Sequence, residues 1–134
     1  MSITARILTP GSARAATLVL SEPLSFWGGF DPQTGIILDQ HHPEAGACVK
    51  DRILVLPAAR GSGGTPACIA ESLRCKVGPA GVILKASDIN VATGTLVAKT
   101  LYGTNCPVVC VTADDYETLC QAAELAIDED GTIT

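Results

Sequence analysis

The chain has 134 residues, of which 47% are hydrophobic and 17% are charged, and its formal net charge is -5. This length suits a single domain over residues 1–134, and the composition favours a packed globule over a disordered chain. The excess of acidic residues provides no basis for binding phosphate backbones, so we expect no nucleic acid partner.

The N-terminal region indicates the cellular location of the protein. Residues 1–20 alternate apolar and polar side chains, and they reach a Pro-Gly pair before the apolar core of a signal peptide could form. The sequence also lacks a run of about 18 apolar residues that could span a bilayer. We therefore expect a cytoplasmic protein without a membrane partner, whose six cysteines stay reduced and act mainly as small buried hydrophobic residues.

The first half of the chain has the pattern of short strands and turns. Residues 3–8 and 15–22 are strand-like segments on either side of a Pro-Gly turn, which predicts a hairpin. A glycine-rich loop with the sequence FWGGF, residues 26–30, then leads into a short strand at 36–39. This half is therefore expected to be rich in β-structure.

The second half alternates strands with helices. Short aliphatic runs predict buried strands at 52–57, 80–86 and 106–112. Thr65 and Asn90 are the expected N-caps of the first two helices, and Gly103 is the expected end of the second. The helices and a closing hairpin are expected at 65–75, 90–103, 113–121 and 123–134. This order predicts an α/β fold with a β-rich N-terminal half, followed by a partly parallel sheet with packed helices.

The segment RGSGG, residues 60–64, lies between an expected parallel strand and an expected helix. Ligands bind just beyond the carboxyl ends of such strands, where glycine N–H groups and a helix N-terminus attract anions. Arg60 adds a full positive charge, and this field would make the hydroxyl of Ser62 a better proton acceptor. The segment alone fits a plain connection, an anion site or a catalytic loop, and it matches neither the P-loop nor the GxGxxG pattern.

The FWGGF segment concentrates three of the chain's five aromatic residues around two glycines. It predicts either a hydrophobic plug over the domain's own core or a loop that faces a partner or covers a substrate. The only two histidines, His41 and His42, follow at adjacent positions. Neighbours in an extended segment point to opposite sides, so we favour an exposed loop here, with an interface contact or a metal ligand as alternatives.

Taken together, EPLSFWGGFDPQTGIILDQHHPEAG at residues 22–46 and ILVLPAARGSGGTPA at residues 53–67 resemble the small subunit of the aconitase X group, the aconitase-like swivel domain. The resemblance extends over nearly the whole chain, and its most specific parts are the Phe-Trp-Gly-Gly segment and the Asp-Pro-x-Thr-Gly turn. It implies a swivelling β/β/α domain that pairs with a large subunit. In this family the large subunit holds an iron or iron–sulfur centre, and the small subunit presents a serine to the substrate.

The resemblance further implies a hydro-lyase subunit that is active only with its large subunit and dehydrates a small hydroxy acid. Ser62 maps to the catalytic base. The expected substrate-binding groups are Arg60, Gly61, Gly63 and Gly64. The expected partner or substrate loop is formed by Phe26, Trp27, Gly28 and Gly29. No metal ligand is expected in this chain.

Family members act on cis-3-hydroxy-L-proline or on mevalonate 5-phosphate. The family's usual Gly-Arg-Gly-Ser with following hydroxyl residues is altered here, because Ala59 precedes the arginine and Gly63 and Gly64 follow the serine. Fewer hydroxyl groups argue against a phosphate site, so cis-3-hydroxy-L-proline is the favoured substrate. A phosphomevalonate dehydratase small subunit and a non-catalytic carboxylate-binding or regulatory module are the alternatives.

Overall fold

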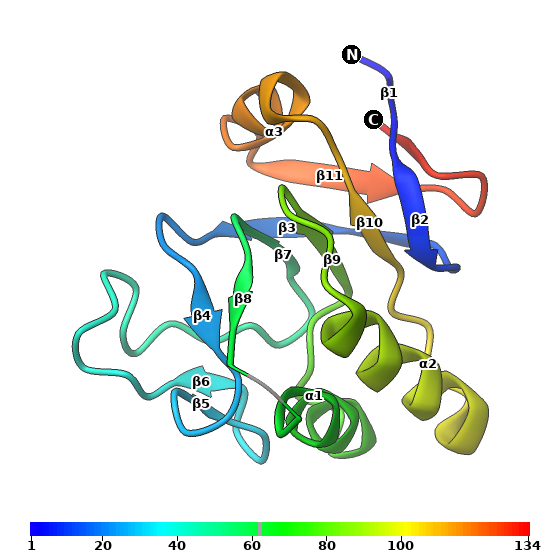
Figure 1. Cartoon of the computed structure of the whole chain (residues 1–134). Coiled ribbons are helices and arrows are strands. Elements are labelled where there is room, and N and C mark those ends of the chain that lie inside the picture. The colour runs from blue at the N-terminus through cyan, green and yellow to red at the C-terminus, as the bar shows by residue number, and fades with distance from the viewer. Residues whose placement is uncertain (62) are drawn as a thin grey trace.

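The computed structural model describes residues 1–61 and 63–134. Its centre is an eight-stranded sheet with the order β1-β12-β11-β3-β7-β9-β10-β2 (Figure 1). Four consecutive strands of this sheet run parallel: β3 (Ala13–Val19), β7 (Ile53–Leu56), β9 (Gly81–Leu84) and β10 (Val108–Cys110). The other four pair antiparallel with their neighbours: β1 (Ile3–Thr4), β2 (Arg6–Thr9), β11 (Glu124–Ile127) and β12 (Thr132–Ile133).

The three strands predicted for the second half of the chain are confirmed, as is the closing hairpin. Every side chain of β7 and β9 is buried, which explains why both appear in the sequence as continuous aliphatic runs. The hairpin predicted from residues 3–8 and 15–22 is wrong. The Pro-Gly segment does not fold back on itself, because the N–H of Ser12 bonds to Asn105 Oδ1 at 3.0 Å, and β2 pairs with β10 instead.

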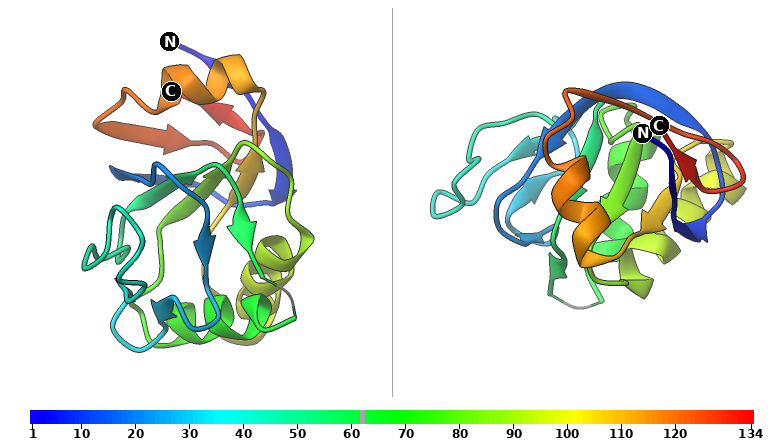
Figure 2. Two further views of the ribbon diagram at one scale, coloured as in Figure 1. Left: turned by 60° about the vertical axis from the view of Figure 1, so that its left-hand side comes forward. Right: turned by 90° about the horizontal axis from the view of Figure 1, so that it is seen from above.

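Helices cover the sheet on two sides. α1 (Thr65–Arg74) and α2 (Ile89–Tyr102) pack on one face, and α3 (Ala113–Leu119) packs on the other (Figures 1 and 2). Alternate side chains of β7 therefore enter two different cores: Leu54 and Leu56 join the core with α1 and α2, while its other two residues join the core with α3. None of the described helices has both the length and the apolar character needed to cross a membrane.

The helix ends differ from the predicted caps in two of three cases. Asp88, not Asn90, caps α2, because its carboxylate accepts two backbone N–H groups, one of them from Asn90 itself at 2.8 Å. Gly64, not Thr65, occupies the cap position of α1. Gly103 ends α2 in the left-handed conformation with φ 69°, as predicted.

Two small sheets lie beside the main one. β4 (Leu24–Ser25) runs parallel to β8 (Ala59–Arg60), and β5 (Phe30–Asp31) runs antiparallel to β6 (Ile36–Ile37). The strand predicted at 36–39 is thus shorter than expected. The β4–β8 pair positions both sequence motifs, because FWGGF follows β4 and RGSGG begins at Arg60, the last residue of β8.

α1 and α2 approach each other closely at Gly94, where an added Cβ would lie 2.8 Å from the carbonyl oxygen of Pro66 and 3.0 Å from Ile69 Cβ. We expect Gly94→Ala to lower the free energy of unfolding by about 1 kcal/mol, because an overpacking cost of about 1–3 kcal/mol exceeds the roughly 1 kcal/mol gained in helix propensity. Thr93→Ala, at an exposed position of the same helix, should leave stability unchanged or raise it. A gain in stability for both variants in urea unfolding would contradict this close contact.

Candidate functional site

The β4–β8 pair brings together two motifs that are more than thirty residues apart in the sequence. Leu24 lies opposite Ala59 and Ser25 lies opposite Arg60, in parallel register. FWGGF follows β4 and RGSGG follows β8, so both loops leave the pair in the same direction (Figure 1). The two segments singled out from the sequence therefore lie side by side.

The RGSGG loop lies at the N-terminus of α1, as expected, but it does not directly follow the carboxyl end of β7. The chain turns after β7 at Pro57, whose carbonyl accepts the N–H of Ala86 from the turn after β9 at 3.0 Å. β8 then carries the chain alongside β4 to the start of α1 (Figures 1 and 2). The predicted position at the strand end is wrong, because the pairing with β4 draws the loop away from that edge of the sheet.

Glycines allow the two loops to touch. A Cβ added at Gly64 would lie 3.0 Å from Trp27 Cγ and 3.1 Å from its Cβ and Cδ2, so the indole rests against bare backbone. Gly61 has φ 101°, in the region that favours glycine, and a Cβ there would lie 3.5 Å from Ser25 Oγ. Ser25 Oγ donates to the carbonyl of Trp27 at 2.9 Å. The contact with Trp27 therefore accounts for Gly64, and the left-handed backbone accounts for Gly61.

The FWGGF segment divides into a buried part and an exposed part. Phe26 and Phe30 are buried, and their rings meet edge to face with 5.4 Å between centroids. Trp27 is 69% exposed, and Gly28 beside it has φ 87° with open space around its Cα. The phenylalanines therefore fill the core, as the plug interpretation predicts, so Phe26 is not available to a partner. Trp27 is the exposed aromatic side chain of the segment, and its contact with a partner or substrate stays a prediction.

Arg60 supplies the full charge of the site. Its side chain is 61% exposed, and its Nη2 lies 4.0 Å from Glu22 Oε1. An exposed ion pair at this separation stabilises little, so the guanidinium can exchange Glu22 for the carboxylate of a ligand. α1 adds a partial positive charge at its N-terminus, because its described first turn carries no acidic residue and its cap residue, Gly64, has no side chain. The loop is therefore suited to bind an anion.

Ser62, the predicted base, lies outside the described residues. Its neighbours Gly61 and Gly63 are both exposed, and a Cβ added at Gly63 would meet no described atom within 4 Å. Of the predicted substrate-binding groups, Arg60, Gly61, Gly63 and Gly64 thus lie on one open loop next to Trp27.

His42 contributes to this region in a way that the sequence did not indicate. The expected exposed loop is correct for His41 but wrong for His42, which is buried. His42 Nδ1 accepts the N–H of Glu44 at 3.0 Å, so Nε2 carries the proton and donates to the carbonyl of Glu22 at 3.1 Å. His42 therefore anchors the segment that leads into β4. This contact spans twenty residues, and no local pattern could have revealed it.

The cysteines do not form a metal site. All six lie in the described part of the chain as free thiols, and Cys68 and Cys106 are buried, as predicted, whereas Cys48 is exposed. Burial raises the pKa of Cys106 to about 12, which disfavours the thiolate that binds metals. Among the described residues, no three His, Cys, Asp or Glu side chains come together around a common point. The described residues therefore do not fit an iron or iron–sulfur centre.

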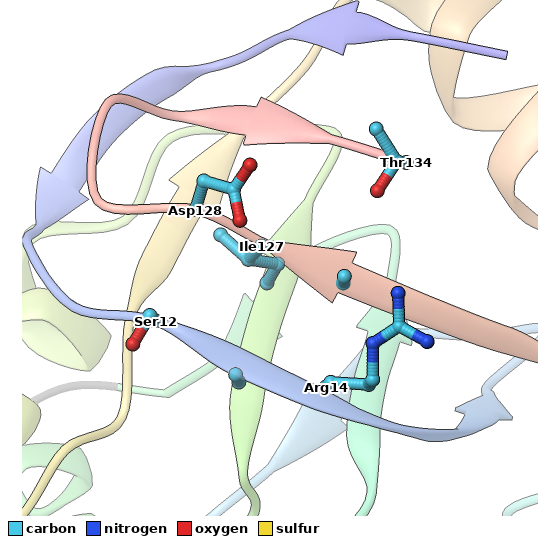
Figure 3. A pocket seen from close by; sticks show the side chains of 7 residues that line it. Ser12, Arg14, Ile127, Asp128 and Thr134 are labelled. Atoms are coloured by element: carbon cyan, nitrogen blue, oxygen red, sulfur yellow. The ribbon is translucent and has the colours of Figure 1, made fainter.

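A hollow of about 490 Å³ lies between the start of β3 and the end of β11 (Figure 3). Its labelled lining residues are Ser12, Arg14, Ile127, Asp128 and Thr134. None of the residues predicted to bind substrate or partner belongs to it. The candidate site thus rests on the two loops beside β4 and β8.

The chain has relatives among known dehydratases. Cis-3-hydroxy-L-proline dehydratase of Hypocrea jecorina is 35% identical over 92% of this chain, and the match covers 21% of that protein. The enzyme of the same name from Pseudomonas aeruginosa is 36% identical over 81% of this chain and 19% of its own length. The chain thus spans about a fifth of these two dehydratases.

A relative of similar size is the phosphomevalonate dehydratase small subunit of Methanothermobacter thermautotrophicus, which is 35% identical over 73% of this chain and 75% of its own length. The fold matches the crystal structure of Thermococcus kodakaraensis aconitase X (holo-form) with a TM-score of 0.84 at 26% identity, covering 99% of this chain and 96% of that one. The sequence profile of the aconitase X swivel domain matches residues 2–134. The chain therefore belongs to the aconitase X swivel domain family.

Proposed function

We propose that this chain is the swivel domain of an aconitase X type dehydratase, in which it works with a larger iron-binding portion and dehydrates cis-3-hydroxy-L-proline. The observation that carries the proposal is the β4–β8 pairing. It holds the exposed Trp27 and the loop from Arg60 to Gly64 together at the N-terminus of α1. Relatives named as dehydratases and dehydratase small subunits support the reaction class.

The proposed role of Ser62 is to remove the proton from the carbon next to the substrate's carboxylate. Hydroxide leaves the adjacent carbon, a carbon–carbon double bond forms, and the net product released is water. Negative charge builds towards the carboxylate as the proton departs. In this proposal Arg60 and the backbone N–H groups of Gly61, Gly63 and Gly64 stabilise that charge, and the dipole of α1 adds to their effect.

The iron or iron–sulfur centre is proposed to belong to the larger portion, because the described residues of this chain present no ligand set. There it would supply a Lewis acid for the departing hydroxide. This chain would contribute the base and the anion-binding loop.

The main alternative is a phosphomevalonate dehydratase small subunit. It is favoured by length, because the chain spans three quarters of that small subunit but only about a fifth of the hydroxyproline dehydratases. The loop at residues 60–64 instead favours cis-3-hydroxy-L-proline, because glycines occupy positions 63 and 64, where hydroxyl side chains would bind a phosphate.

Turnover by the chain together with its cognate large aconitase X portion, assembled anaerobically with iron and sulfide, tests this function. We expect dehydration of cis-3-hydroxy-L-proline, followed by NMR, with a kcat/KM at least about tenfold above that for mevalonate 5-phosphate. A reversed ratio would establish the alternative substrate. Tight carboxylate binding by this chain in calorimetry, without turnover of either compound by the assembly, would instead indicate a binding or regulatory module.

A further inference from the structure

α2 carries an exposed apolar stripe formed by Ile89, Leu96, Val97 and Leu101. Ile89 is 78% exposed and Leu101 is 65% exposed. Their helical spacing places them along the outer side of α2, opposite the residues that pack on the sheet. Together with Thr100, the last three of them line a shallow hollow of about 300 Å³. Exposed apolar side chains gathered on one helix face in this way mark an interaction surface.

The stripe begins at the end of the molecule that holds the candidate site. α1 and α2 lie side by side, and Gly94 in the second turn of α2 contacts Pro66 in the first turn of α1. Gly64, just before α1, contacts Trp27. A row of direct contacts thus leads from the exposed indole across the start of α1 to α2. A large partner seated on the site loops is therefore near the start of α2, and it must extend along the helix to cover Leu96, Val97 and Leu101.

The exposed apolar area of the stripe distinguishes between two candidate partners, a second copy of this chain and the larger dehydratase portion. Its four side chains expose roughly 400 Å² of apolar surface, so a symmetric pair of stripes would bury about 800 Å², less than the roughly 1,000 Å² that a specific interface needs. A second copy of this chain is therefore a poor occupant. A partner that covers both the stripe and Trp27 buries enough surface for a stable contact.

The apolar character of the stripe indicates what kind of partner surface would bind to it. Lys99 is the only charged residue within α2, and its Nζ lies 3.5 Å from the carbonyl of Pro10, away from the stripe. The partner surface must therefore offer aliphatic or aromatic side chains and not charges. In the dehydratases of which this chain spans about a fifth, the remaining polypeptide is available to provide such a surface.

We infer that the α2 stripe docks the larger dehydratase portion and extends the contact made at the site loops. This inference rests on the proposed function and adds to it a second anchoring surface outside the chemistry. The stripe holds the domain on its partner, while Arg60 and the glycine loop act on the substrate.

The test is a titration of this chain with its cognate large aconitase X portion, purified as a separate polypeptide and followed by calorimetry. We expect the double variant Leu96→Glu, Leu101→Glu to bind about a hundredfold more weakly than the unaltered chain, because two charges would be buried without partners. At saturating concentrations of the large portion, its kcat should stay within about twofold of the unaltered value, since neither side chain touches substrate. Ile7→Glu is the control, because Ile7 is an exposed apolar residue on β2, outside the stripe.

Unchanged affinity of the double variant, or equal weakening by Ile7→Glu, would overturn the docking surface. So would self-association of the unaltered chain in light scattering that the double variant abolishes, because a second copy would then be the occupant. Failure of the proposed function has a different signature: the unaltered chain binds the large portion, and the double variant weakens binding, but the assembly dehydrates no hydroxy acid. In that case the docking surface stands without the proposed reaction.

Discussion

Replacing Ser62 with alanine is expected to lower the kcat of the assembled dehydratase by about a thousandfold, because a positioned general base contributes roughly 10²–10⁴ to the rate. The substrate's carboxylate would still meet Arg60 and the backbone N–H groups of the loop, so KM should change little. Steady-state turnover of cis-3-hydroxy-L-proline measures both constants. Sedimentation of the assembly should be unaffected.

The matched control is Ser12→Ala, which removes the same hydroxyl from an exposed position outside the candidate site. It should retain full turnover. If Ser62→Ala kept more than about a tenth of the normal kcat, another group would have to act as the base, and Ser62 would be left with at most a packing role. Loss of assembly in Ser62→Ala would likewise speak against a purely chemical function for this hydroxyl.

Arg60→Gln is expected to raise the KM of the assembled dehydratase for its substrate. Losing a charged hydrogen bond to a carboxylate costs about 1.5–3 kcal/mol, which corresponds to a rise of roughly 10–100-fold in KM. kcat should fall less than kcat/KM does, because binding of the carboxylate precedes the proton transfer. Initial rates over a range of substrate concentrations separate the two constants.

Arg14→Gln provides a close control for this variant. Arg14 is also an exposed arginine in a loose ion pair, with its Nη1 3.5 Å from Glu124 Oε1, but it lies outside the site. Its loss should leave KM and stability unchanged. A KM for Arg60→Gln no higher than that for Arg14→Gln would remove the guanidinium from substrate binding.

Much of the fold could be predicted because its signals are local. The aliphatic runs that become β7, β9 and β10 are buried on both sides, and Gly103 ends α2 where a left-handed residue is needed. Strand pairing was harder to predict, because the partner of a strand is set by tertiary contacts that a turn motif does not contain. The Pro-Gly segment after β2 resembles a hairpin turn, yet Ser12 bonds to Asn105, more than ninety residues away, and this contact separates the two strands.

The candidate site was predictable in its residues but not in its assembly. Arg60 and Trp27 stood out by composition and by the family resemblance. That their loops touch depends on β4 and β8, two strands of two residues each, which are too short to produce a periodic pattern. The role of His42 was missed for a related reason, because its bonds to the backbone of Glu22 and Glu44 depend on the path of the chain and not on any motif.

The contact between Gly64 and Trp27 carries an evolutionary consequence. A Cβ at position 64 would lie 3.0–3.1 Å from Trp27, so even alanine requires the indole to shift, and a larger residue is tolerable only if position 27 shrinks or its ring swings outward. Across the sequences of this family, the two positions should therefore co-vary, although they lie in separate motifs and share no ladder hydrogen bond. An alignment in which bulky residues at 64 occur freely beside tryptophan at 27 would show that this coupling is peculiar to the present chain.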